Sequence, residues 1–78
     1  MPVLRLFAAA REAAGTGRAE VDGTTVEAVV GAAVERYGEG FAAVVATAKV
    51  WVNGEPADPG QAVAAGDEVA ILPPVSGG

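Results

Sequence analysis

The sequence predicts an α+β domain in which a mixed sheet of four to five strands carries one main helix on one face. Three observations favour this class: one segment has helical periodicity, several short segments alternate with the period of a strand, and turn signals separate them. The chain has 78 residues, of which 51% are hydrophobic, so we expect one small domain with a packed core.

The N-terminal part is predicted to form two short strands around a helical turn. Residues 3–7 alternate, so that Leu4 and Leu6 share the face that is turned toward the core. The alanine-rich residues 8–14 favour a short helical turn, which the glycines after it end. Residues 18–21 then form a weak second strand, and an Asp-Gly turn follows.

The main helix is predicted from about Thr25 to Tyr37. Its apolar residues recur at intervals of three and four, which places them on one stripe of an amphipathic helix. These residues are Val26, Val29, Val30, Ala33, Val34 and Tyr37. Thr24 and Glu27 have the spacing of a capping box, and Gly38 stands where helices commonly end.

The C-terminal half is predicted to hold three more strands. Residues 49–52 alternate, and the Asn-Gly pair after them is a strong hairpin signal, so residues 55–57 become a very short return strand. Residues 68–72 form the last strand, because their apolar side chains alternate between two faces. The apolar run 41–46 is of uncertain type, and a short helical turn is one interpretation.

This order of elements is that of the ubiquitin-like β-grasp fold, which we therefore predict for residues 1–72. Two prolines follow the last strand and stop both ladder pairing and helix formation. The two terminal glycines have no side chains that could pack. Residues 73–78 are therefore predicted to form an extended, flexible C-terminal tail.

Composition excludes several classes of function. The chain has no cysteine and no histidine, which rules out disulfides, thiol nucleophiles, Cys or His metal sites and the usual general base, so we do not expect an enzyme. Its net charge of −5 and scattered basic residues argue against nucleic acid as a partner. Without a long apolar run or a signal peptide, we expect a soluble, cytoplasmic protein that does not bind membranes.

Four segments match one family at corresponding spacing. The C-terminal run Gly66–Gly78, the stretch Leu6–Glu12, the helix start Thr25–Glu27 and the hairpin Val52–Gly54 resemble the small subunit of molybdopterin synthase, the MoaD family. The ending Gly-Asp-Glu-Val-Ala-Ile-Leu-Pro-Pro-Val-Ser-Gly-Gly is fairly specific, whereas a bare Gly-Gly would be a weak signal.

The resemblance implies a sulfur carrier that is noncatalytic by itself. The C-terminal Gly78, preceded by Gly77, would be adenylated by an enzyme similar to ubiquitin-activating enzymes, and sulfur would then replace the adenylate to give a thiocarboxylate. The large subunit of molybdopterin synthase would use this sulfur to build the dithiolene of molybdopterin. The carrier would bind no cofactor, because the activating enzyme is the component that uses ATP.

The residues of the tail suit this chemistry. A free α-carboxylate is ionised at neutral pH and is a poor electrophile, so it needs activation and not a base on the carrier. Gly77 and Gly78 lack β-carbons, which lets the chain pass through a narrow tunnel in a partner. Pro73 and Pro74 favour an extended base of the tail and lower the entropy that is lost on insertion.

A second candidate site is predicted on the face of the sheet that the helix leaves open. If the last strand lies between the first strand and residues 49–52, Phe7, Leu72 and Trp51 form a row on this face, which is typical of a partner surface. The resemblance also implies partner contacts at positions that match Phe7 and Leu72 and in the hairpin near Pro56. The predicted partner-binding residues are therefore Phe7, Trp51, Pro56, Leu72, Pro73, Pro74 and Val75. The alternatives are ordinary exposed apolar residues or a shifted register. Asp67 and Glu68 could contact partners or serve only the turn.

Other functions stay open beside the molybdopterin role. The same thiocarboxylate could deliver sulfur to thiamin thiazole, to cysteine or to another acceptor, although the ending Pro73-Pro74-Val75 favours the molybdopterin branch. An activated Gly78 could instead form an amide with target lysines, as in a ubiquitin-like modifier. A plain β-grasp interaction module is the remaining alternative, and it predicts no ATP-dependent modification.

Overall fold

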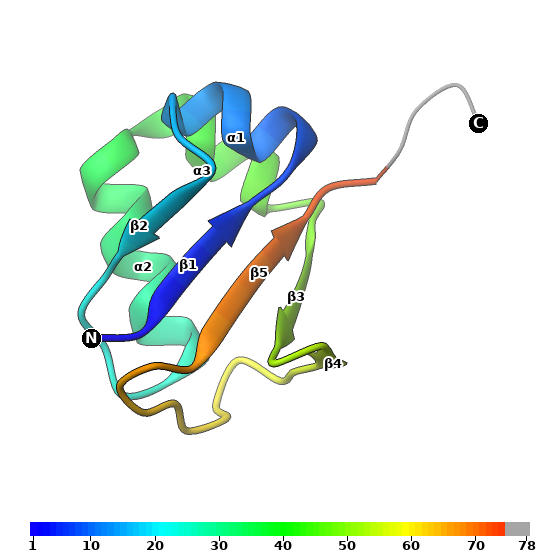
Figure 1. Ribbon diagram of the computed structural model, residues 1–78. Helices are drawn as coiled ribbons and strands as arrows, with labels where there is room; N and C mark the ends of the chain where they lie inside the picture. Colours follow the sequence, from blue (N-terminus) through cyan, green and yellow to red (C-terminus); the bar gives the residue numbers. More distant parts are fainter. Residues whose placement is uncertain (75–78) are drawn as a thin grey trace.

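The computed structural model describes residues 1–74 and confirms an α+β domain with an open five-stranded sheet (Figure 1). The strands are β1 (Val3–Leu6), β2 (Arg18–Glu20), β3 (Lys49–Val52), β4 (Glu55–Pro56) and β5 (Glu68–Leu72). The helices in this part of the chain are α1 (Ala8–Ala14), α2 (Val26–Tyr37) and α3 (Glu39–Val45). The sheet faces the viewer in Figure 1, α2 lies behind it and α1 lies past the end of β1, so one face of the sheet is uncovered.

The strand order is β2-β1-β5-β3-β4, as expected for a β-grasp fold. β1 and β5 run parallel, and the other three neighbouring pairs are antiparallel. The first and last strands therefore pair in the middle of the sheet, and both end at the same edge. This arrangement places the start of the C-terminal segment beside the end of β1.

The hydrophobic core lies between the sheet and the helices. Alternate strand residues and one stripe of α2 point into it, which confirms the two periodicities in the sequence. The core consists of Leu4, Leu6, Ala10, Val21, Val26, Val29, Ala33, Phe41, Val52, Val63, Val69 and Ile71. Phe41 of α3 is the largest of its fully buried side chains, and its ring lies 5.3 Å from that of Tyr37. The apolar run of uncertain type thus forms a helix that covers one end of the core.

The start of α2 differs from the predicted capping box. The N-cap is Thr25, whose Oγ1 accepts a hydrogen bond from the Ala28 N–H at 3.1 Å. The carbonyl of Thr24 accepts a hydrogen bond from the Val63 N–H at 2.9 Å. Because this bond holds Thr24 to a distant loop, the helix begins one residue later than a Thr24–Glu27 box requires. The capping box was therefore a wrong prediction, although a threonine does cap the helix.

The predicted hairpin is present between β3 and β4. Asn53 and Gly54 have φ angles of 50° and 84°, which is the left-handed pair that a two-residue type I′ turn requires.

The tail beyond Pro74 lies outside the described residues, so the predicted roles of Val75, Gly77 and Gly78 stay predictions. Within residues 1–74, no helix has the length and apolar character needed to cross a membrane.

Candidate functional site

The candidate site lies where β5 ends and the chain leaves the sheet through Pro73 and Pro74. β1 ends at the same edge because it runs parallel to β5, and β3 begins there because it runs antiparallel to β5. Three elements thus meet at the base of the C-terminal segment, as Figure 1 shows.

The register of the strands decides which side chains meet on the open face. Leu6 pairs with Ile71, and Phe7 keeps an extended backbone with φ −128° and ψ 152°, so Phe7 follows on beside Leu72. On the other side, Leu72 pairs with Lys49. The predicted adjacency of Phe7 and Leu72 is therefore consistent with the register, and a lysine completes their row.

Trp51 does not lie in that row, which corrects the predicted arrangement. Trp51 pairs with Ala70 and lies two residues beyond Lys49 on β3, which places it diagonal to Leu72. Diagonal neighbours in a sheet remain within reach of an aromatic side chain. Pro56 pairs with Trp51 on the outer side, so the hairpin extends the apolar surface toward the edge of the sheet.

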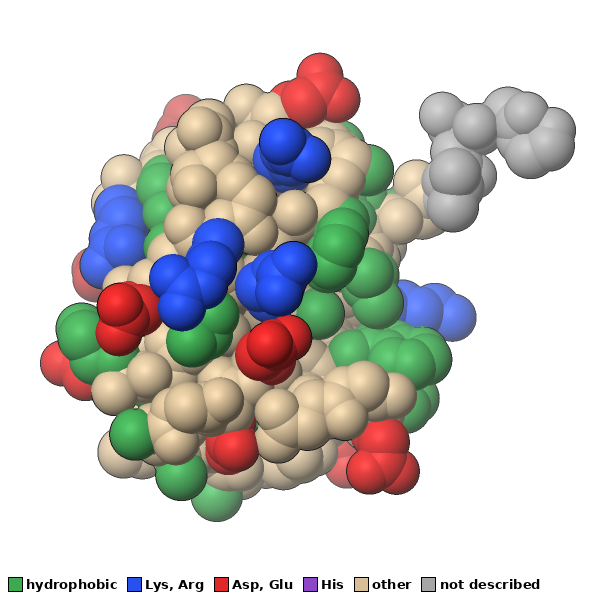
Figure 2. All heavy atoms as spheres, viewed as in Figure 1, with side chains coloured by type: hydrophobic (Ala, Val, Ile, Leu, Met, Phe, Trp, Pro, Cys, Tyr) green, Lys and Arg blue, Asp and Glu red, His purple; other side chains and the backbone are tan. Residues whose placement is uncertain are grey.

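We call Phe7, Trp51, Pro56 and Leu72 the open-face patch. Phe7 is 42% exposed, Pro56 is exposed, and Trp51 and Leu72 are half-buried. Figure 2 shows hydrophobic side chains gathered on this face beside the start of the C-terminal segment. Pro73 is half-buried and Pro74 is exposed, so the prolines continue the surface toward the end of the chain.

Basic side chains flank the open-face patch. Arg5 on β1 stands opposite Arg18 on β2, and Lys49 stands on the other side at the start of β3. The guanidinium of Arg5 lies 3.8 Å from a carboxylate oxygen of Glu68, but both side chains are largely exposed, so this ion pair contributes little to stability. Figure 2 shows blue side chains over the β1–β2 side of this face. A partner with acidic groups around an apolar centre would complement this arrangement, although the whole chain is acidic.

A set of hydrogen bonds holds the β3–β4 turn to the start of β5. Asp67 accepts hydrogen bonds from the Ala64 N–H at 2.8 Å and from the Asn53 side-chain amide at 3.1 Å. Asn53 Oδ1 in turn accepts from the Glu68 N–H at 2.9 Å, and the Asn53 N–H donates to the Glu68 carbonyl at 2.9 Å. These bonds fix the alignment of β3 with β5, and therefore the positions of Trp51 and Leu72 in the open-face patch.

The pKa of Asp67 is held below its ordinary value, first by the hydrogen bond from the Ala64 backbone and then by the bond from Asn53. A carboxyl whose pKa is lower in the folded state stabilises the fold above its unfolded pKa, and this stabilisation disappears as the pH falls through the folded value. Asp67 therefore acts in the turn, which was one of its two predicted roles.

We expect Asp67→Asn to lower the melting temperature at pH 7, because the amide nitrogen would face a backbone donor. The difference from the unchanged chain should begin to shrink as the pH falls below the ordinary pKa of 3.8, where Asp67 of the unfolded chain becomes protonated. It should disappear as the pH falls through the lower pKa of Asp67 in the folded state. Thermal melts followed by circular dichroism from neutral to strongly acidic pH would measure this. Asp22→Asn makes the same change at an exposed residue and is the matched control, which should leave the melting temperature nearly unchanged. A constant difference across the pH range would contradict the role of Asp67.

The arrangement in residues 1–74 offers a surface for binding. Within residues 1–74, no cluster of three or more His, Cys, Asp or Glu side chains is placed to hold a metal ion. The described part of the chain also contains no buried polar or charged side chain. Sequence reasoning identified the apolar members of the open-face patch but missed Lys49 and the Asn53–Asp67 bond. The Asn-Gly signal pointed to Asn53 as a turn residue only.

Comparison with known proteins gives three matches of nearly full length. The sequence model of the ThiS family matches residues 4–78. Small archaeal modifier protein 1 of Haloferax volcanii is 44% identical over 88 aligned positions, which cover 95% of this chain and 97% of that protein. Its crystal structure superposes with a TM-score of 0.84 at 39% identity and covers 99% of this chain and 98% of that one.

Two further solved structures share the fold at lower identity. A putative molybdopterin converting factor, subunit 1, from Pyrococcus furiosus has a TM-score of 0.83 at 26% identity, over 95% of this chain and 97% of that one. The BexX/CysO complex of Amycolatopsis orientalis contains a match with a TM-score of 0.84 at 25% identity, over the full length of both chains. Together with the β-grasp sheet and the family match, these similarities show that the chain belongs to the ThiS family of ubiquitin-like sulfur carriers and modifiers.

Proposed function

We propose that this chain carries sulfur as a thiocarboxylate on Gly78 and donates it for the molybdopterin dithiolene as the small subunit of molybdopterin synthase. The observation that carries the proposal is the place where the C-terminal segment of this ThiS-family protein leaves the sheet. The segment that ends in Gly-Gly starts at the edge of the open face, directly beside Phe7 and Leu72. A partner that docks on this face therefore lies next to the segment that leads to Gly78.

The chemistry proceeds in two steps that partners catalyse. A carboxylate oxygen of Gly78 attacks the α-phosphorus of ATP, pyrophosphate leaves, and the carboxyl becomes an acyl-adenylate. Hydrosulfide then attacks the carbonyl carbon, and AMP leaves with the electron pair of the broken C–O bond, which yields the thiocarboxylate. The carrier supplies no nucleophile or base of its own, in agreement with its lack of cysteine and histidine. Because ATP is the co-substrate, we place this reaction in the cytoplasm.

The open-face patch is proposed as the docking surface for the adenylating enzyme and for the large synthase subunit. An apolar centre with basic residues around it has the composition of a small protein interface. The crystal complex of BexX with CysO contains a chain of the same fold together with a partner, which supports this part of the proposal.

We expect Phe7→Ala or Leu72→Ala to weaken binding to the adenylating enzyme by about 1–3 kcal/mol, because each removes an apolar contact at the centre of the patch. The fold should persist, since neither side chain belongs to the buried core. Isothermal titration calorimetry would measure the affinity, and circular dichroism would report the fold. Glu35→Ala, an exposed residue of α2 on the other side of the sheet, is the control and should bind normally. Normal affinity for both patch variants would remove this docking surface.

The decisive experiment on the function is intact-mass spectrometry. The chain is incubated with ATP, sulfide and the adenylating enzyme of its host, and the mass is compared with that of the untreated chain. The proposal expects a gain that corresponds to one oxygen replaced by sulfur, and it expects none without ATP. An unchanged mass, with an enzyme that activates another carrier, would overturn the sulfur-carrier function and favour a plain interaction module.

The final acceptor is tested by adding candidate partners to the thiocarboxylated chain. If the proposal is right, the large subunit of molybdopterin synthase with its precursor returns the chain to the carboxylate mass. A thiazole synthase or a cysteine-forming enzyme should leave the thiocarboxylate intact. Loss of sulfur only to one of these enzymes would keep the carrier function and change the acceptor.

A second candidate function, protein modification, is favoured by the similarity to small archaeal modifier protein 1. The acyl-adenylate of Gly78 would then be attacked by the amine of a target lysine, and an amide would form as AMP leaves. Blots of host extracts with an antibody against the chain distinguish protein modification from sulfur transfer. Bands of higher mass that depend on Gly78 would support conjugation, and their absence would leave sulfur transfer as the function.

A further inference from the structure

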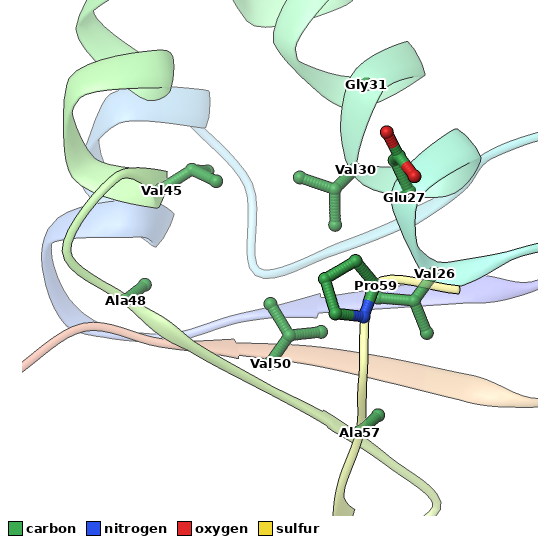
Figure 3. Close-up of a pocket in the computed structure, with 9 residues that line it drawn as sticks. All are labelled: Val26, Glu27, Val30, Gly31, Val45, Ala48, Val50, Ala57 and Pro59. Carbon is green, nitrogen blue, oxygen red and sulfur yellow. The ribbon is translucent and has the colours of Figure 1, made fainter. Parts of the chain in front are cut away.

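An apolar pocket of about 460 Å³ opens on the helix side of the sheet, away from the open-face patch (Figure 3). α2, the end of α3, the start of β3 and the loop after β4 surround it. Its lining consists of Val26, Glu27, Val30, Gly31, Val45, Ala48, Val50, Ala57 and Pro59. Figure 3 shows the side chains of Val30, Val45 and Val50 around a common space. The volume is in the range of pockets that hold small molecules or anchoring side chains.

The pocket and the open-face patch lie on opposite faces of β3. Val50 lines the pocket, whereas its neighbours Lys49 and Trp51 point to the open face, because side chains alternate along a strand. A group bound in the pocket would not compete with a partner on the open-face patch.

The edge of β3 beside the pocket is already occupied. β4 pairs with Trp51 and Val52, and the Ala57 N–H extends the ladder by one bond of 3.1 Å to the Val50 carbonyl. Lys49 pairs with Leu72 on β5, and the Ala48 N–H donates to the Val45 carbonyl at 3.1 Å. A partner would therefore reach the pocket with a side chain and not by strand addition.

No described neighbour of Gly31 requires a glycine at this position. Gly31 lies in the middle of α2, where glycine is about 1 kcal/mol less favourable than alanine. A β-carbon on this residue would meet no atom of residues 1–74 within 4 Å, so no contact in this part of the chain excludes alanine. Since Gly31 lines the pocket, close approach of a bound group to the helix is a physical reason for the missing side chain.

The charge around the pocket is negative. Glu27 is the charged residue of the lining, and the exposed acidic residues Glu55 and Asp58 adjoin the loop that completes it. Lys49 belongs to the other face of β3. A partner that carries a positive charge next to an apolar side chain would complement this surface.

We propose that this pocket is a second docking site, which takes an aliphatic side chain from a partner segment with arginine or lysine beside it. The aliphatic side chain enters the space between Val30, Val45 and Val50, and the basic residue of the segment faces Glu27. This inference goes beyond sulfur transfer and does not depend on it, because the site is independent of the chain end.

The test is an NMR titration of the full isotope-labelled chain with three blocked pentapeptides. The probe is Arg-Val-Leu-Val-Arg, and the controls are Glu-Val-Leu-Val-Glu and Arg-Val-Ser-Val-Arg. We expect the probe to shift the methyl resonances of Val30, Val45 and Val50 saturably, with a Kd in the millimolar range or below. The methyl groups of Leu72 should not move, and both controls should bind more weakly.

Matched glycine variants separate binding from stability. Gly31→Ala should raise the melting temperature, because alanine has the higher helix propensity. It should lower the affinity for the probe about fivefold or more, because the new methyl group enters the pocket. Gly40→Ala on α3 also has open space around its β-carbon but does not line the pocket, so it should leave probe binding unchanged. Glu27→Gln should lower the affinity for the probe about two- to fivefold, because it removes the charge that faces the basic residue.

Several outcomes would overturn the second docking site. These are no shift of the pocket valines at millimolar probe, equal shifts with the Glu peptide, or full affinity of Gly31→Ala. A dilution series adds another: pocket resonances that move with protein concentration alone would assign the pocket to a second copy of this chain.

Discussion

Deletion of Gly78 is expected to abolish formation of the thiocarboxylate, and Gly78→Ala is expected to reduce its yield. Deletion withdraws the reacting carboxylate by one residue, about 3.3–3.6 Å of extended chain. A displacement of about 1 Å already lowers the rate of an enzymatic reaction about 100-fold, so the shortened chain should not be activated. Alanine keeps the length but places a β-carbon next to the carbonyl, where the partner has to approach.

Intact-mass spectrometry after incubation with ATP, sulfide and the adenylating enzyme measures both effects. Gly60→Ala is the control, because it makes the same change at an exposed site with open space around the β-carbon. It should give the full yield. Normal thiocarboxylate formation from both Gly78 variants would contradict the requirement for Gly78 in activation.

Phe41→Ala is expected to lower the free energy of unfolding by about 3–5 kcal/mol, the largest effect on stability that we predict. Phe41 is fully buried, and its ring packs against that of Tyr37 at 5.3 Å. Alanine would leave a cavity where α3 covers the end of the core. Domains have total stabilities of about 5–15 kcal/mol, and those of this size tend toward the low end, so the variant should be near unfolding.

Phe7→Ala is the matched control, because it removes the same side chain from a site that is 42% exposed. We expect a loss of about 1 kcal/mol or less for this variant. Urea unfolding measures both, with the fluorescence of Trp51, the single tryptophan of the chain, as the probe. Equal destabilisation by the two changes would contradict the assignment of Phe41 to the core and Phe7 to a surface. Phe7→Ala should thus impair partner binding, whereas Phe41→Ala should lower the stability of the fold.

Most of the fold could be predicted from the sequence, because its local signals agree with one another. The stripe of α2, the alternation of β1 and β5 and the Asn53–Gly54 turn are properties of neighbouring residues, and all three are confirmed. The candidate site was predicted in part: Phe7 and Leu72 follow from the strand order once the β-grasp arrangement is assumed. Their role as a docking surface remains a prediction.

The relations between distant segments were decided by the tertiary structure. Trp51 lies opposite Ala70 and not in the row of Phe7 and Leu72, since the bonds among Asn53, Asp67 and Glu68 set the register of β3. The N-cap of α2 is Thr25 and not the predicted Thr24, because the Thr24 carbonyl accepts a hydrogen bond from the Val63 N–H.

The sequence by itself determined the type and order of the elements, the side of each that is buried, and a glycine ending without cysteine or histidine nearby. These features depend on side-chain periodicity and residue type, which can be read within a few positions. The alignment of strands, the hydrogen bonds between Asn53 and Asp67 and the pocket beside Gly31 were decided only by the tertiary structure. The physical reason is that each depends on hydrogen bonds and packing between residues far apart in the chain, for which local pattern carries no signal.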